Sequence, residues 1–272
     1  MTRRFDAMPE DGLTVVIPTY NEAARIAGTI DQLVRGLSDY RPLELLVIDD
    51  GSQDQTVATV NELVAAQPAL ALIASASNRG KGAAVRQGML HAHGRYMVFV
   101  DADLPVTVSD IRRLVQRVDE GADVAIASRA LREATVTVAA PPRRIASRAF
   151  NLAVRALFGL RFGDTQCGVK AFRREAAQAI FSRMQIDGFA FDVEALVIAQ
   201  RLGLSVAELP VTCANAGLST VRIARHASSV LSDLWRIRAN RGRGRYEKTI
   251  TISPAPAAAP TRSRVRSVPQ TP

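Results

Sequence analysis

The stretch LTVVIPTY, residues 13–20, followed by NEAARIAGTIDQLVRGL, residues 21–37, decides the fold of this chain. The first part is apolar up to Pro18, as is typical of a strand buried on both faces. The second part predicts an amphipathic helix, with Asn21 as its cap, because apolar side chains recur at helical spacing at Ile26, Ile30, Leu33, Val34 and Leu37. A buried strand followed by such a helix is the repeating unit of a parallel sheet.

The same alternation continues along the chain. Further strands are predicted over 43–51, 69–75, 95–103 and 122–129, and further helices over 52–66, 78–93 (behind a short loop) and 109–120. Ser52 or Asp54 stands near the start of the second helix. We therefore expect an α/β fold with a Rossmann-like, mostly parallel central sheet and helices on both faces.

Length and composition agree with a globular protein. The chain has 272 residues, and 47% of them are hydrophobic, enough for a substantial core. It contains no run of 18 apolar residues, and MTRRFDAMPEDG at its start lacks a hydrophobic signal region. We expect a cytoplasmic protein without a membrane span. The two cysteines, Cys167 and Cys213, lack a CxxC spacing and are expected to be reduced thiols.

The positive charge is concentrated at the C-terminal end. Residues 222–272 hold eleven basic and two acidic side chains, a difference that equals the whole formal net charge of +9. Such a segment could meet nucleic acid, an anionic membrane surface or only solvent. Nucleic acid is not expected as a partner, because only 5% of residues are aromatic and no nucleic-acid-binding motif accompanies the charges. Residues 253–272 are rich in Pro, Ala, Ser and Arg, and disorder is expected there.

Polar residues gather where the predicted strands end. In a parallel sheet ligands bind beyond the carboxyl ends of the strands. The segments PTYNE, DDGS, NRGKG and DAD would bring one set of charged residues to this edge: Glu22, Asp49, Asp50, Lys81, Asp101 and Asp103. Asp101 and Asp103 are two residues apart, so in an extended strand they would point to the same side. Together they could bind a hard divalent cation with a diphosphate; the alternative is two solvated acids.

Five blocks of the sequence carry a resemblance to a known family. They are VVIPTYNEAARI (15–26), VIDDGSQDQT (47–56), NRGKGAAVRQGM (78–89), VDADLP (100–105) and GDTQCGVKAFRREAA (163–177). In this order they resemble the GT-A family 2 glycosyltransferases. The last block resembles the branch that transfers sugars to polyprenyl phosphates, the dolichyl-phosphate glucosyltransferase and mannosyltransferase type. The resemblance implies a domain over 13–240, with a nucleotide-binding half (13–129) and an acceptor half (130–240), between a flexible start (1–12) and a basic disordered tail (241–272).

The resemblance implies roles at the donor end of the site. Asp103 would bind Mg²⁺ or Mn²⁺, and Asp101 would contact the ribose or reach the metal through water. Asp50 resembles the acid that reads the base or ribose, whereas Asp49 is either a ligand or a structural residue. Lys81, in a Gly-rich loop, suits the diphosphate or the acceptor phosphate. The residues expected to contact the nucleotide sugar are Pro18, Tyr20, Glu22, Asp50, Lys81 and Asp101.

At the acceptor end, the predicted helix over 143–158 mixes arginines with apolar residues, which suits a phosphate on a lipid tail; an ordinary surface helix is the alternative. Asp164 and Gln166 resemble active-site groups near the donor sugar. By the same resemblance we assign catalytic roles to Asp164, Gln166 and Arg129. The expected contacts of the acceptor phosphate are Arg148, Asn151 and Lys170, and Arg129 is a further candidate for this contact.

The resulting prediction is an inverting transferase that moves a hexose from a nucleotide sugar, UDP-glucose, to a polyprenyl phosphate. A transferase of the same fold with a soluble hydroxyl acceptor is the alternative, since PVTCANAGLSTVR (210–222) lacks a lysine that the family commonly has. Pro105 stands where some mannosyltransferases have a metal-binding glutamine, which favours the glucosyltransferase branch. A peripheral contact with the inner face of an anionic membrane would use the helix over 229–248, through Leu231, Leu234, Trp235 and Ile237.

Overall fold

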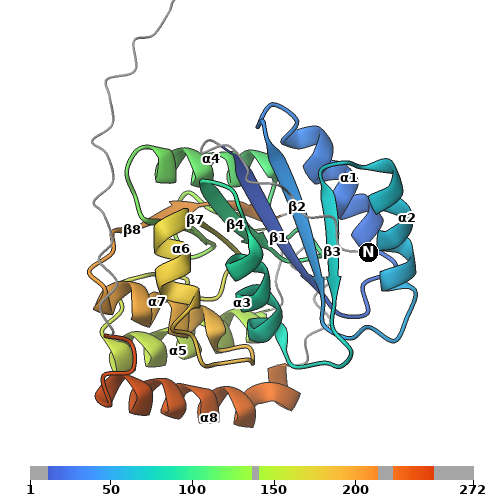
Figure 1. Ribbon diagram of the computed structural model, residues 1–272. Helices are drawn as coiled ribbons and strands as arrows, with labels where there is room; N and C mark the ends of the chain where they lie inside the picture. The colour runs from blue at the N-terminus through green and yellow to red at the C-terminus, as the bar shows by residue number, and fades with distance from the viewer. Residues whose placement is uncertain (1–11, 137–140, 214–222, 248–272) are drawn as a thin grey trace, which may run out of the picture.

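One seven-stranded sheet forms the centre of the protein (Figure 1). The computed structural model describes residues 12–136, 141–213 and 223–247. The strands are β1 (Leu13–Thr19), β2 (Leu43–Asp49), β3 (Leu70–Ala74), β4 (Tyr96–Val100), β5 (Val124–Ser128), β7 (Val169–Arg173) and β8 (Val206–Pro210). They lie in the order β3-β2-β1-β4-β7-β5-β8, and all pairings are parallel except those of β7 with β4 and β5. The predicted mostly parallel sheet is confirmed.

Helices cover both faces of this sheet (Figure 1). One face carries α1 (Ile26–Gly36), α2 (Thr56–Ala66) and α4 (Val108–Asp119). The other carries α3 (Lys81–His91), α5 (Pro141–Phe158), α6 (Arg174–Phe181), α7 (Phe191–Arg201) and α8 (Ile223–Gly242). Alternate side chains of each strand point into one core or the other, so Val16 packs with the second group of helices and Val15 with the first. Burial on both faces explains why β4 and β5 are almost entirely apolar.

The first two helices begin later than predicted. Asn21 has a positive φ of 55° and does not cap α1, because its side-chain oxygen accepts a hydrogen bond from the backbone of Gln53 instead. Asp54 accepts bonds from the amide of Thr56, at the start of α2, and from the amide of Ala23. The turns that follow β1 and β2 are therefore bonded to each other at the sheet edge.

Strand β7 brings a later part of the chain to that edge. Because β7 runs antiparallel to β4, its first residue, Val169, lies opposite Val100, the last residue of β4. The segment 163–168 consequently meets the D-A-D segment. Strands from both sides of the predicted boundary between residues 129 and 130 belong to one sheet, because β5 lies between β7 and β8. A short parallel pair, β6 (Thr135–Val136) with β9 (Thr212–Cys213), lies beside it.

The C-terminal end departs from the sequence-based expectation. A disordered tail was expected from residue 241, but α8 continues to Gly242 and the described chain runs to Glu247. Tyr246 is fully buried, and its hydroxyl donates a hydrogen bond to Glu194. The chain therefore stays against the core up to residue 246, because the apolar ring of Tyr246 packs there between α7 and α8. The remaining tail (248–272) and the start of the chain (1–11) lie outside the described residues.

Candidate active site

Asp101 and Asp103 follow β4 at the carboxyl edge of the sheet, as predicted. The amide of Asp101 donates to the carbonyl of Gly168, 3.1 Å away, which joins the D-A-D segment to the chain entering β7. The Asp101 carboxylate also occupies the space beside Gly168: a Cβ at that glycine would lie 2.2 Å from Asp101 Oδ2. The glycine is therefore required for the position of the aspartate.

Lys81, the first residue of α3, points at this pair. Its Nζ lies 2.6 Å from Asp101 Oδ1. Burial would lower the pKa of Lys81, but the carboxylates of Asp101, Asp192 and Asp103 outweigh it and raise that pKa. Gly80, with φ of 114°, lets the loop before α3 pass close to Asp187, whose carbonyl oxygen would lie 2.4 Å from an added Cβ. The lysine therefore stays protonated beside the acids.

Asp103 and Glu22 lie close enough for their charges to interact. Burial first, and then the negative charge of Asp101, raise the pKa of Asp103, whereas Lys81 and Arg25 oppose this. The pKa of Glu22 is raised too, chiefly by burial, and the Asp103 charge contributes. Within the described chain, Asp103 Oδ1 is buried without a hydrogen-bond partner. An acidic oxygen in this state favours a bound cation.

The donor set for such a cation is incomplete within the protein. No group of three His, Cys, Asp or Glu side chains with metal-binding geometry occurs among the residues that the structure describes. Asp101 and Asp103 supply two carboxylates, and Mg²⁺ commonly binds one or two carboxylates together with substrate phosphates and water. The residues present therefore fit a cation that arrives with a diphosphate.

The aspartates after β2 have local partners. Asp49 accepts a hydrogen bond of 2.9 Å from the amide of Ser52. This bond favours a structural role for Asp49 over a role as a ligand. Asp50 is almost fully buried and accepts from the amides of Arg79, at 2.9 Å, and Gly80, at 2.7 Å. These bonds tie the NRGKG loop to the end of β2, and the expected contact of Asp50 with a base or ribose stays a prediction.

Arg129 and Asp164 form a two-pronged ion pair. Arg129 follows β5, and its Nε and Nη2 lie 2.6 and 3.1 Å from the two carboxylate oxygens of Asp164. Burial would raise the pKa of Asp164, but the bonds and charge of Arg129 lower it below its usual range. The amide of Gln166 donates to the same carboxylate at 3.2 Å. The structure thus brings the three predicted catalytic residues together.

Two further side chains hold this loop. Asn151, on α5, donates from Nδ2 to the carbonyl of Gly163 and accepts from the Thr165 hydroxyl at 3.2 Å. Glu208, on β8, accepts from the amides of Gly163, at 2.8 Å, and Asp164, at 2.9 Å. Sequence reasoning missed Glu208, although an acid within the apolar strand VAELP was a signal. Asn151 thus supports the loop of residues 163–165, whereas an acceptor contact is the role predicted for it.

Lys170 also differs from its expected role. Its side chain is fully buried in β7, and Nζ lies 2.6 Å from Asp192 Oδ1 and 2.9 Å from the Cys167 carbonyl. A buried, paired ammonium cannot meet a phosphate arriving from solvent, so the expected acceptor contact is not supported. Asp192, in the first turn of α7, was missed; an acid at a helix start was its only signal.

The remaining predicted residues lie around the edge. Pro18 is buried in β1, Tyr20 is exposed after it, and Arg148 is exposed on α5 one turn before Asn151. On α8, Leu231 and Trp235 are exposed by 59% and 70%, as a membrane contact requires. The prediction is wrong for Leu234 and Ile237, which are buried in the core between α8 and the sheet. Residues 248–272 of the predicted tail and the segment 214–222 lie outside the described residues.

Comparisons with known proteins show the family of this chain. The model of the family "Glycosyl transferase family 2" matches residues 14–181. The dolichyl-phosphate beta-glucosyltransferase of Dictyostelium discoideum is 32% identical over 83% of this chain and 73% of its own length. The enzyme of the same name from Saccharomyces cerevisiae is 34% identical over 83% of this chain and 74% of its own.

A solved structure shares the fold. Glucosyl-3-phosphoglycerate synthase from Mycobacterium tuberculosis, in complex with Mn²⁺, UDP and glucosyl-3-phosphoglycerate, aligns with a TM-score of 0.63 over 84% of this chain and 80% of its own. Its sequence identity is 22%, so the likeness concerns the fold. With a family match over more than half of the chain and two relatives above 30% identity, the chain belongs to the family 2 glycosyltransferases.

Proposed function

We propose that this chain transfers a glucosyl residue from UDP-glucose to a polyprenyl phosphate, with inversion at the sugar C1. The names of the relatives at 32% and 34% identity support both the sugar and the lipid acceptor. The observation that carries the proposal is the ion pair between Arg129 and Asp164. It bears on the acceptor because it determines whether the site holds a general base.

A hydroxyl acceptor needs a base to remove its proton, whereas a phosphate monoester is already an anion at neutral pH. Asp164 is the carboxylate of the DTQ loop, and both of its oxygens are bonded to Arg129. Its lowered pKa makes it a poor base. An acceptor that needs only positioning suits this arrangement, and Arg129, partly exposed, has N–H groups beyond those that Asp164 uses, which would bond to a phosphate.

At the donor end, Asp101 and Asp103 would hold Mg²⁺ or Mn²⁺ together with the diphosphate. The metal would neutralise the negative charge that develops on the departing diphosphate. Lys81 adds a positive charge at the same place, and its bond with Asp101 holds it there. Tyr20 is exposed after β1, where its ring could pack on the base. Glu22, whose pKa the nearby charge of Asp103 helps to raise, would accept ribose hydroxyls.

A membrane contact would bring the protein to its lipid acceptor. No helix in the described part of the chain is long and apolar enough to cross a bilayer. Among the side chains of α5 and α8 that the structure describes, the large exposed apolar ones are Leu152, Leu157, Leu231 and Trp235, and arginines lie beside them. This pattern is typical of a peripheral contact, in which apolar side chains enter the bilayer surface and arginines meet anionic headgroups.

The test uses radiolabelled UDP-glucose and GDP-mannose, each with detergent-dispersed polyprenyl phosphate or with 3-phosphoglycerate, in the presence of Mn²⁺. We expect label from UDP-glucose in the organic phase, and only with the lipid. If the label is transferred only to 3-phosphoglycerate and stays in the aqueous phase, the proposed acceptor is refuted. Transfer from GDP-mannose alone would refute the proposed sugar.

Two variants test the metal-binding residues. Asp103→Asn should lose metal-dependent transfer by about 100-fold or more while keeping the wild-type melting temperature. Asp31→Asn, which removes a carboxylate from an exposed ion pair on α1, is the matched control and should keep full activity. Full activity of Asp103→Asn would exclude Asp103 as a metal ligand.

A further inference from the structure

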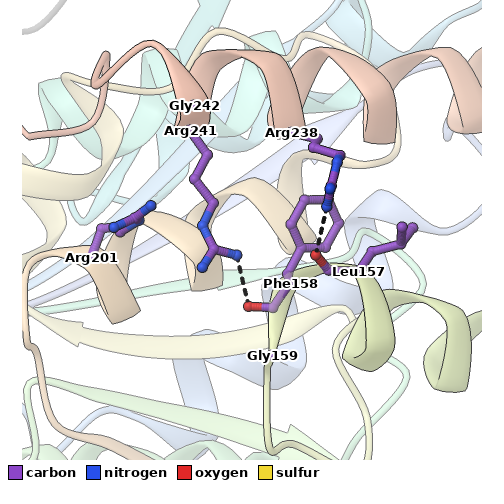
Figure 2. Close-up of a pocket in the computed structure, with 7 residues that line it drawn as sticks. All are labelled: Leu157, Phe158, Gly159, Arg201, Arg238, Arg241 and Gly242. Atoms are coloured by element: carbon purple, nitrogen blue, oxygen red, sulfur yellow. Dashed lines mark hydrogen bonds between the residues drawn. The ribbon is translucent and has the colours of Figure 1, made fainter.

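A pocket of about 410 Å³ lies at the C-terminal ends of three helices, and the described site does not use it (Figure 2). Its lining comes from the last turn of α5, the last residue of α7 and the last turns of α8: Leu157, Phe158, Gly159, Arg201, Arg238, Arg241 and Gly242. Three of these side chains are arginines from two different helices. Three positive charges thus line one pocket, together with Leu157 and Phe158, although like charges repel each other.

Part of the explanation is local. Arg241 donates from Nη1 to the Phe158 carbonyl at 2.9 Å, and Arg238 donates to the Leu157 carbonyl at 3.4 Å, as Figure 2 shows. These carbonyls belong to the last turn of α5, where such groups have no partner within the helix. Each bond uses one of the five N–H groups of a guanidinium. Capping therefore explains the position of two arginines but leaves most of their donors for another acceptor.

Arg201 is not part of this capping. Its Nη1 lies 3.4 Å from Oε1 of Glu247, and both side chains are partly exposed, so the pair is weak. The side chains of Arg201, Arg238, Arg241 and Glu247 have a net charge of +2, against which the partial negative charges of the three helix ends act. A phosphate monoester carries a charge near −2 at neutral pH and offers three acceptor oxygens. Guanidinium groups bind such oxygens with paired, charge-assisted hydrogen bonds.

The pocket lies where two exposed helix faces meet. On α8, the positions 231, 235, 238 and 242 follow one another at helical spacing, so exposed Leu231 and Trp235 lead directly to Arg238 and Gly242. On α5, the positions 148, 152, 155 and 159 follow the same spacing and end at Gly159. Both faces carry exposed apolar and basic side chains. A headgroup that enters the pocket would thus come from the surface that these faces contact.

We propose that this pocket binds the phosphate monoester headgroup of a membrane lipid and anchors the protein at the bilayer, separately from the transfer site. Arg201 and Arg241 would hold the phosphate oxygens, and Leu157 would lie along the start of the lipid chains. This inference rests on the membrane contact proposed above. It adds a defined headgroup site to a contact that would otherwise depend on dispersed charge.

The test measures vesicle binding with the full chain. Trp235, the only tryptophan, lies one turn from Arg238 and reports contact by a blue shift of its fluorescence. Vesicles contain phosphatidylcholine with either phosphatidic acid or phosphatidylglycerol, at equal surface charge. We expect tighter binding to phosphatidic acid, and roughly tenfold weakening by Arg201→Gln, since this substitution removes charge-assisted hydrogen bonds to the phosphate. Arg243→Gln, an exposed arginine outside the pocket, is the matched control.

The outcomes are distinct. If Arg243→Gln and Arg201→Gln weaken binding equally, or if both anionic lipids bind equally, the contact depends on dispersed charge. Either result would overturn the headgroup site in the pocket. Arg201-dependent binding of inorganic phosphate, with none to vesicles, would overturn the lipid source. Absence of wild-type binding to any vesicle would refute the membrane contact itself. Transfer to detergent-dispersed acceptor should be unchanged in Arg201→Gln, which separates the anchor from the activity.

Discussion

The Asp101 carboxylate lies where the side chain of residue 168 would begin: a Cβ on Gly168 would be 2.2 Å from Asp101 Oδ2. Gly168 precedes β7, and Asp101 follows β4. The two residues are 67 positions apart in the chain, and they meet because β7 pairs antiparallel with β4. The position of the proposed metal-binding carboxylate therefore depends on the absence of a side chain on the neighbouring strand.

Gly168→Ala should displace Asp101 and lower the rate of transfer by about 100-fold, the usual cost of misplacing a catalytic group by about 1 Å. Steady-state kinetics with saturating UDP-glucose and Mn²⁺ would measure it. Gly28→Ala, inside α1 with open space around it, is the control and should be fully active. Wild-type kinetics in Gly168→Ala would show that the Asp101 position is not critical.

The pair between Lys170 and Asp192 predicts a stability effect. Lys170→Met removes the ammonium that lies 2.6 Å from the buried Asp192 carboxylate, which should cost about 3–5 kcal/mol of unfolding free energy. The double variant Lys170→Met with Asp192→Leu should recover most of this loss, because it removes both charges. Urea unfolding of the single and double variants measures the coupling. If the double variant does not recover its unfolding free energy and its KM for the acceptor changes, the phosphate-binding role of Lys170 is supported instead.

The pair between Arg129 and Asp164 predicts a pH dependence. The pKa of Asp164 is lower in the folded than in the unfolded protein, so its ionised form stabilises the fold above about pH 4, and this contribution is lost as the pH falls through the folded value. In Arg129→Gln, burial would raise that pKa, and the ionised carboxylate would then destabilise the fold above pH 4. Unfolding free energies between pH 3 and 7 should therefore diverge from wild type as the pH rises.

The matched control for this pH series is Arg117→Gln, which removes an exposed arginine from α4. Its free energy of unfolding should follow the wild type over the whole range. A constant offset between Arg129→Gln and wild type, independent of pH, would mean that the guanidinium stabilises by packing and not through Asp164.

The buried Tyr246 predicts where the chain can be shortened. Ending the chain after Glu247 should leave the melting temperature unchanged, whereas ending it after Asn240 removes the Tyr246 ring and should cost about 3–5 kcal/mol. Tyr246→Phe keeps the ring and loses the hydroxyl, which donates to Glu194, so it should cost about 1–3 kcal/mol. Equal stability of the two shortened chains would show that Tyr246 does not close the core.

Much of the fold could be predicted because it follows from local patterns. Strands buried on both faces must be apolar throughout, and helices on a sheet must be amphipathic, so the alternation over residues 13–129 is readable directly. The antiparallel insertion of β7 was not predicted, because strand order depends on pairing between distant segments. The start of α1 was missed because Asn21 bonds to the next turn along the sheet edge.

For the site, the residue types and their order along the chain determined which segments meet at the carboxyl edge and which chemistry they suit. Asp101, Asp103 and Lys81 could be placed there because parallel strands end at one edge. Only the tertiary structure decided what each charged side chain contacts. It buries Lys170 against Asp192, ties Asp50 to the NRGKG loop and occupies Asp164 with Arg129. These partners are distant in sequence, and whether a charge faces solvent or another charge depends on packing that no local pattern records.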